Sequence, residues 1–93
     1  MGGKMAKKVA VMVRDNQQEG LRMAVGLTLE DNAVSVFVMD KKLASGDDMD
    51  LNVETLGDMD AKIYSNNPEN KFEQRTTQEV ARALPEFDVV IQY

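Results

Sequence analysis

Three short segments of the chain are apolar at nearly every position. They are residues 8–13 (KVAVMV), 34–39 (VSVFVM) and 88–93 (DVVIQY). Strands that are buried on both faces of a sheet show this continuous pattern, whereas half-buried strands alternate apolar and polar residues. Residues 61–65 (AKIYS) form a weaker segment of the same kind. The pattern therefore predicts four strands, with the first one inside the sheet and one of the last two nearer an edge.

Between the first two segments the apolar residues change to helical spacing. Residues 17–30 have the spacing of one helical face, with residues three, four, seven and eight positions after Leu21. The residues of this face are Leu21, Ala24, Val25, Thr28 and Leu29. A second, weakly polar stripe on the same helix contains Met23, Gly26 and Leu27. The apolar arc is wider than a helix with one buried face needs, so these three residues are candidates for an interface between subunits.

The ends of this first helix are marked by polar residues. Asp15 or Asn16 is suited to the N-cap position, because the short side chain of either residue accepts a hydrogen bond from the first turn. Asn32 is expected to end the helix in the left-handed conformation.

Two further helices are indicated by their N-terminal residues. Asp47 or Asp48 is suited to cap a helix that runs to about Asp58. Thr76 and Glu79 have the spacing of a capping box, which predicts a helix that ends before the next proline. The residues expected to point inward on these two helices are Met49, Val53, Leu56, Val80, Ala83 and Leu84.

These elements alternate along the chain in the order βαβαβαβ. Right-handed crossovers place successive strands parallel, so we expect an α/β fold, a three-layer α/β/α sandwich with a four-stranded, mainly parallel sheet. The length of 93 residues allows one hydrophobic core. We therefore predict a single domain over residues 7–93 and interpret residues 1–6 as a disordered N-terminus or an expression-vector remnant.

Composition limits the chemistry that the chain can perform. It has no cysteine and no histidine, so it has no thiolate nucleophile, no persulfide carrier, no thiolate metal site and no imidazole, which is the commonest metal ligand and general base. The formal net charge of −5 opposes binding to nucleic acid and to anionic membranes. The longest apolar runs are about six residues, too short for a membrane span or a signal peptide. We expect a cytoplasmic protein that has no cofactor, metal, nucleic-acid or membrane partner.

In open α/β sheets, ligands bind outside the carboxyl ends of the strands. The loops there supply the candidate ligand-binding residues, which are Arg14, Asp15, Asn16, Ser65, Asn66, Asn67 and Arg75. No glycine-rich phosphate-binding motif is present in these loops. The acidic residues 47–60 start like a calcium-binding EF-hand loop, but Val53 and Met59 occupy its glycine and glutamate positions, which favours a solvated acidic helix. A phospho-acceptor receiver domain fits poorly, because no aspartate follows the third strand.

Taken together, four segments resemble the DsrE/DsrF-like sulfur-relay superfamily over residues 7–93: KKVAVMVR, EGLRMAVGLTLED, VSVFVMD and FDVVIQY. The resemblance implies a small α/β/α protein that forms homo-oligomers or assembles with related DsrE-like subunits. The members that transfer sulfur carry a persulfide on a cysteine in the loop after a middle strand. Here that loop begins Ser65, Asn66, Asn67, and these side chains cannot hold a sulfane sulfur as a thiolate does.

Three functions follow from the sequence. The first is a non-catalytic DsrE-like subunit or interaction module that self-associates. The second is a small-ligand-binding protein that uses the loops at the strand carboxyl ends. An enzyme is the third and weakest, and it would depend on groups such as Arg14 and Asp15.

Overall fold

The apolar segments form the centre of a parallel sheet. The computed structural model describes residues 7–93, so the predictions for residues 1–6 lie outside the described residues. Strands β1 (Lys8–Val13) and β2 (Ala33–Val38) pair in parallel, and their inner residues are buried. β3 (Lys62–Ser65) lies beside β2, and β5 (Val89–Gln92) lies on the other side of β1. The predictions of an internal first strand and of an edge position for one of the last strands are confirmed.

The sheet has five strands, so the predicted number of four is wrong. The additional strand is β4 (Glu73–Gln74), which pairs in parallel with β3 and completes the order β4-β3-β2-β1-β5. It lies within the long loop after β3, and the predicted order βαβαβαβ therefore lacks one strand. Two exposed polar residues have little intrinsic strand preference, and only their backbone pairing with Tyr64 and Ser65 makes them a strand.

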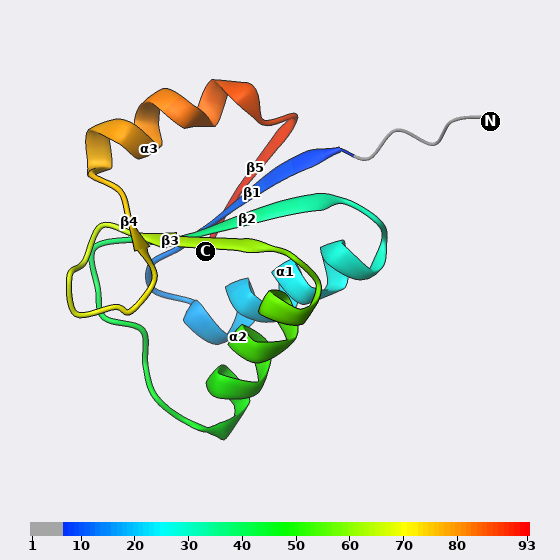
Figure 1. Cartoon of the computed structure of the whole chain (residues 1–93), viewed down its shortest axis with the longest axis vertical. Helices are drawn as coiled ribbons and strands as arrows, with labels where there is room; N and C mark the ends of the chain where they lie inside the picture. Colours follow the sequence, from blue (N-terminus) through cyan, green and yellow to red (C-terminus); the bar gives the residue numbers. More distant parts are fainter. Residues whose placement is uncertain (1–6) are drawn as a thin grey trace.

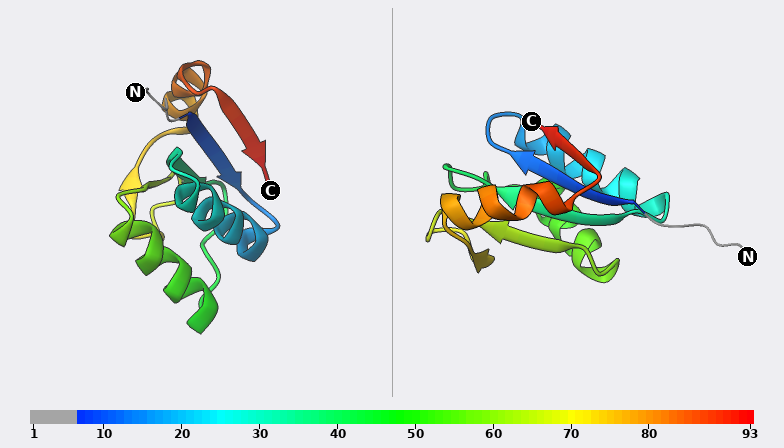
Figure 2. Two further views of the ribbon diagram at one scale, coloured as in Figure 1. Left: turned by 90° about the vertical axis from the view of Figure 1, so that its right-hand side faces the viewer. Right: turned by 90° about the horizontal axis from the view of Figure 1, so that it is seen from above.

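Helices cover the two faces of the sheet unequally (Figures 1 and 2). α1 (Gln17–Leu29) and α2 (Asp47–Asp58) lie on one face, where they cover a core of valines from β1 and β2. α3 (Thr77–Ala83) and the short 3₁₀ turn η1 (Leu84–Glu86) lie on the other face over Met12, Phe37 and Met39. The second face therefore has less helical cover than the first, because a single short helix and a 3₁₀ turn lie on it.

The capping box predicted at Thr76 and Glu79 is confirmed. The Thr76 side chain accepts a hydrogen bond from the Glu79 N–H at 3.0 Å, and the Glu79 carboxylate accepts one from the Thr76 N–H at 2.8 Å. α3 ends at Ala83, before Pro85, and the chain tightens into η1 instead of leaving the helix axis. The capping box therefore fixes the start of α3, the single helix on the less covered face of the sheet.

Other helix ends differ from the predictions. Leu29 was expected to point inward but is 69% exposed, because α1 ends at this residue. Asp31, and not Asn32, takes the left-handed conformation with φ of 65°, while the Asn32 side chain donates to the Leu27 carbonyl at 3.0 Å. The N-cap residue of α2 is Gly46, and the following aspartates lie in the first helical turn.

Within residues 7–93, no helix has the length and apolar character required to cross a membrane.

Candidate functional site

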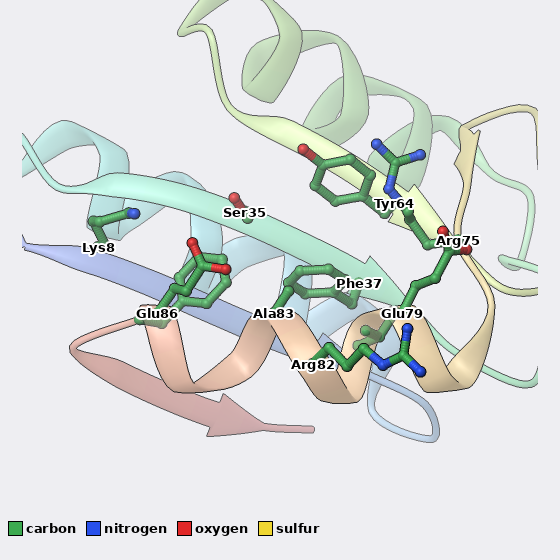
Figure 3. A pocket seen from close by; sticks show the side chains of 11 residues that line it. Lys8, Ser35, Phe37, Tyr64, Arg75, Glu79, Arg82, Ala83 and Glu86 are labelled. Atoms are coloured by element: carbon green, nitrogen blue, oxygen red, sulfur yellow. The ribbon is translucent and has the colours of Figure 1, made fainter.

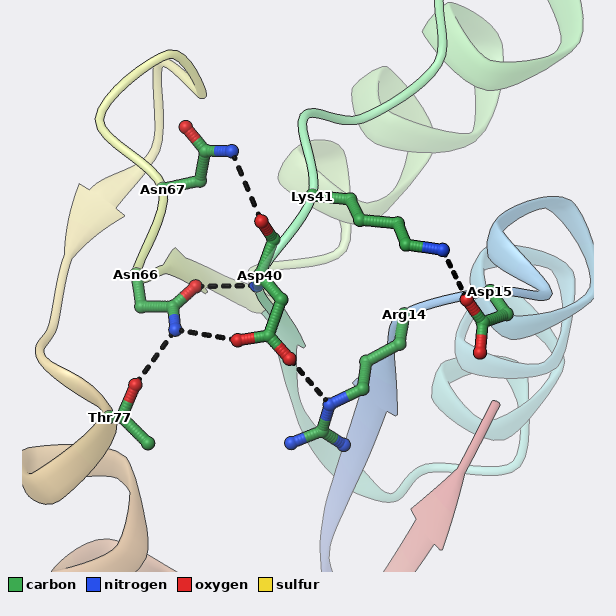
Figure 4. A network of polar contacts seen from close by, with 7 residues as sticks. All are labelled: Arg14, Asp15, Asp40, Lys41, Asn66, Asn67 and Thr77. Atoms are coloured by element: carbon green, nitrogen blue, oxygen red, sulfur yellow. Dashed lines mark hydrogen bonds and ion pairs between the residues drawn. The ribbon is translucent and has the colours of Figure 1, made fainter.

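A polar network joins the loops at the carboxyl edge of the sheet (Figure 4). At its centre is Asp40, which follows β2. Arg14 Nε donates to one Asp40 carboxylate oxygen at 2.9 Å, and Asn66 Nδ2 donates to the other at 3.1 Å. The Asp40 N–H in turn donates to Asn66 Oδ1 at 2.6 Å. Asn66 also donates to Thr77 Oγ1 at 2.8 Å, so the network extends to the start of α3.

The environment of Asp40 favours its ionised form. The hydrogen bond from Asn66, followed by the one from Arg14, lowers the pKa of the Asp40 carboxyl below its ordinary value. The Asp40 backbone is left-handed, with φ of 70°, a conformation that aspartate tolerates better than most residues. Residues of the two neighbouring loops, Arg14 and Asn66, thus hold the carboxylate as an acceptor.

Four of the seven predicted ligand residues come together here. Arg14 and Asn66 bind Asp40 directly, Asp15 forms an ion pair with Lys41, and Asn67 Nδ2 lies 3.5 Å from the Asp40 carbonyl oxygen. These groups are directed at one another, so the network is largely satisfied within the chain. The central acceptor, Asp40, lies in one of the loops expected at the carboxyl ends of the strands, but it was not among the predicted ligand residues.

The other three predicted residues have different environments. Asn16 occupies the N-cap position of α1 without a side-chain capping bond. Ser65 is completely buried, and its hydroxyl accepts hydrogen bonds from Asn70 Nδ2 at 2.8 Å and from the Asn67 N–H at 3.0 Å. Arg75 lies away from the network, with its guanidinium 5.0 Å from the Tyr64 ring centroid. The seven residues therefore do not form one site.

The usual ligand position of such a sheet is filled by the chain itself. Strand order reverses between β1 and β5, and ligands of open α/β sheets bind at this crevice. Here the Tyr93 main-chain oxygen lies against the N–H groups of Arg14, Asp15 and Asn16, at 3.4, 3.1 and 2.9 Å. A methyl group on Gly20 would lie 2.8 Å from a Val13 methyl carbon and 3.2 Å from Tyr93 Cβ, so glycine permits this close packing.

Beyond β5 the sheet presents an apolar edge. Val89 and Val90 are each 38% exposed, although both belong to a strand. On the α1 face, Val89, Ile91 and Leu27 line a depression of about 380 Å³, and the polar residues Lys7, Glu30 and Asn32 form the rest of its rim. Within residues 7–93, no strand pairs with the outer side of β5.

Two of the predicted interface residues extend this edge. Leu27 lines the depression, while Met23 is 40% exposed and lies one turn earlier on the same side of α1. Gly26 is half-buried, and the space beside it is open. We call Met23, Leu27, Val89, Val90 and Ile91 the β5-edge surface.

Comparisons with known proteins identify no relative. No family model, no curated protein and no solved structure matches the chain. In residues 7–93, no group of three or more acidic side chains is placed to hold a metal ion.

Proposed function

We propose that the chain is a non-catalytic interaction module that self-associates through the β5-edge surface. The observation that carries the proposal is the combination of an unpaired strand edge with exposed apolar side chains from both β5 and α1. An open strand edge is a template for pairing with another chain, and proteins normally protect it with charges, proline, bulges or a cover. The residues of β5, Val-Val-Ile-Gln, include no charge and no proline.

The occupant that best fits this edge is a second copy of the chain. A two-fold axis at the edge pairs β5 antiparallel with its copy, and each surface then contacts its own equivalent. In that arrangement Asp88, at the start of one strand, faces the uncharged Gln92 end of the other. Like charges therefore do not oppose one another, and Met23 and Leu27 of each copy flank the junction.

The non-catalytic part of the proposal is supported by the polar network. Its charged groups bind one another around Asp40, and the crevice between β1 and β5 is filled by Tyr93. The proposal also includes membership of the DsrE/DsrF-like superfamily, a homo-oligomer or an assembly with related subunits, and a cytoplasmic location. Support for the family comes from the parallel α/β order of the elements.

The direct test is the solution mass measured by light scattering over a concentration series. We expect a mass of twice the 10.4 kDa chain at micromolar concentration. Val90→Lys places two like charges near the two-fold axis and should raise the dissociation constant of the dimer by at least about tenfold.

The matched control is Leu51→Lys. Leu51 is an exposed apolar residue on α2, 62% accessible, and it lies outside the β5-edge surface. This variant should keep the mass of the parent protein. Met23→Glu tests the helical side of the same surface without altering β5. A parent chain that stays monomeric at millimolar concentration, or variants at positions 90 and 23 that dimerise like the parent, would contradict the proposal.

A further inference from the structure

Met23 lies where α1 passes the apolar edge of the sheet. Gly20, one turn earlier, lies against the residue that follows β5, since a methyl group on Gly20 would be 3.2 Å from Tyr93 Cβ. Leu27, one turn later, lines the depression beside the start of β5. Residues three or four positions apart share one face of a helix. Met23 is therefore on the side of α1 that faces β5.

Met23 is also the most exposed methionine of residues 7–93. It is 40% exposed, and three of the other methionines are buried. The buried ones are Met12, Met39 and Met49. Met59 is half-buried, and its sulfur accepts a hydrogen bond from Thr28 Oγ1 at 3.2 Å. Because a dissolved oxidant must reach the sulfur, the Met23 thioether is the one of these five that should be oxidised first.

The groove on the α3 face of the sheet offers no comparable group (Figure 3). It has a volume of about 340 Å³, and Phe37 and Tyr64 stack along it with ring centroids 5.2 Å apart. Phe37 is only 3% exposed, and Arg75 pairs with Glu73. The other charged residues of the groove are two cations and two acids: Lys8, Arg82, Glu79 and Glu86. No methionine of residues 7–93 lines this groove, so the accessible thioether and the exposed apolar strand coincide at the β5 edge.

In the proposed dimer, Met23 lies close to the two-fold axis. The axis passes the paired β5 strands near Val90. Met23 is the middle residue of α1 and is level with the middle of β5, because Gly20 lies beside the end of that strand and Leu27 beside its start. A two-fold axis repeats every contact, so the junction contains two thioethers. A chemical change of the Met23 side chain therefore acts on the interface twice.

The chemical change available to a thioether is oxidation to the sulfoxide. With hydrogen peroxide, the sulfur attacks one oxygen atom, the O–O bond breaks and an S–O bond forms. The other oxygen leaves with both hydrogens as water. Sulfur loses two electrons, and the peroxide gains them. The product is polar where the thioether was apolar, and methionine sulfoxide reductases reverse the reaction.

We propose that oxidation of Met23 by a hydroperoxide dissociates the dimer and that reduction of the sulfoxide restores it. This inference rests on the proposed self-association and adds its regulation. The sulfoxide oxygen is a hydrogen-bond acceptor, and the apolar side chains of the β5-edge surface offer it no donor. Burial of one such group in each copy should raise the dissociation constant by at least about tenfold. Oxidation should in turn be slower in the dimer, which covers Met23.

The test treats the full chain with hydrogen peroxide at a protein concentration just above the dissociation constant of the dimer. Peptide mass spectrometry follows each methionine, and light scattering follows the solution mass. Met23 should gain an oxygen atom before the other methionines of residues 7–93, and the mass should fall from dimer to monomer in step with it. A pair of methionine sulfoxide reductases, one for each sulfoxide epimer, should restore the dimer.

The two control variants each remove one sulfur. Met23→Leu keeps an apolar side chain of similar volume, so this variant should dimerise and stay dimeric in peroxide. Met59→Leu keeps the Met23 thioether, so its dimer should dissociate in peroxide like that of the parent protein.

Three results would overturn the inference. They are a dimer that persists after Met23 is oxidised, a Met23→Leu dimer that dissociates in peroxide as readily as the parent, and a loss of the circular dichroism spectrum along with the mass, which would attribute dissociation to unfolding. A parent chain that is monomeric before peroxide is added contradicts the proposed dimer itself. A dimer that survives oxidation of Met23 contradicts its regulation alone.

Discussion

The two edge strands of the sheet, β4 and β5, differ in length, in charge and in the contacts that hold them. β4 has only two residues, Glu73 and Gln74, both exposed and polar, and it is followed by Arg75. Its own Gln74 side chain fixes it to the preceding loop, because Gln74 Nε2 donates to the backbone carbonyls of Asn67 and Asn70. β5 has four residues and no charge, and apolar packing against β1 and α1 holds it in place.

This contrast indicates that the sheet ends at β4, whereas a further strand can pair with β5. Short length and charge make β4 a poor template for pairing, whereas β5 has neither protection. The two edges should therefore respond to different substitutions. Loss of a polar side chain should damage the β4 side, and a change in packing should damage the β5 side.

The largest effect is expected at Asn70, beside β4. Asn70 is buried and bonds to the Leu43 N–H at 2.8 Å, the Lys41 carbonyl at 3.1 Å and Ser65 Oγ at 2.8 Å. Asn70→Ala leaves buried polar groups without partners and should lower the free energy of unfolding by about 3 kcal/mol. Urea denaturation measures this change. Lys71→Ala on the same exposed loop should change stability little, and equal effects of the two variants would count against the role of the buried amide.

An intermediate effect is expected on the β5 side at Gly20. The methyl group of Gly20→Ala must displace Val13 or Tyr93, which should cost about 1–3 kcal/mol. Hydrogen exchange should accelerate first in the amides of β5. The control is Gly57→Ala in α2, where the added methyl group meets nothing within 4 Å. That variant should stabilise the chain by up to about 1 kcal/mol, and destabilisation by both variants would show that packing at Gly20 is not special.

The smallest effect, and the only one that depends on pH, is expected at Asp40. The lowered pKa means that the stabilisation is fully present above the ordinary aspartate value of about 3.9 and is lost as pH falls through the folded-state pKa. Asp40→Asn should therefore cost less than about 1 kcal/mol at pH 7, because the site is exposed. The difference between the two proteins should shrink at pH 3. Urea denaturation at both pH values checks this, and a constant difference would contradict the assignment.

The strands and the layer order follow from sequence patterns, while the contacts between loops do not. The continuous apolar runs of β1 and β2 are buried on both faces, as their pattern predicts. Thr76 and Glu79 form the predicted capping box because both partners lie within one turn. Local chemistry and periodicity are sufficient for such features.

The missed features depend on residues that are far apart in the chain. The groove requires Phe37 and Tyr64 to be paired across two strands, and this register emerges only when the sheet is assembled. Arg75 was assigned to the same site as Arg14, but the backbone pairing of β4 with β3 sends it toward Tyr64. Asn66 and Asp40 are each polar loop residues, and nothing local indicates that they bind one another.

The position of β1 between β2 and β5 has a consequence during synthesis. β2 ends at Val38, but β5 begins 51 residues later at Val89. At a synthesis rate of about 5–20 residues per second, one edge of β1 stays unpaired for roughly 3–10 s until β5 has been made. Throughout that interval the nascent chain exposes a strand of valine, alanine and methionine, which makes it most prone to aggregate before the final strand arrives. A variant that loosens β5 would return the finished protein to the same vulnerable state.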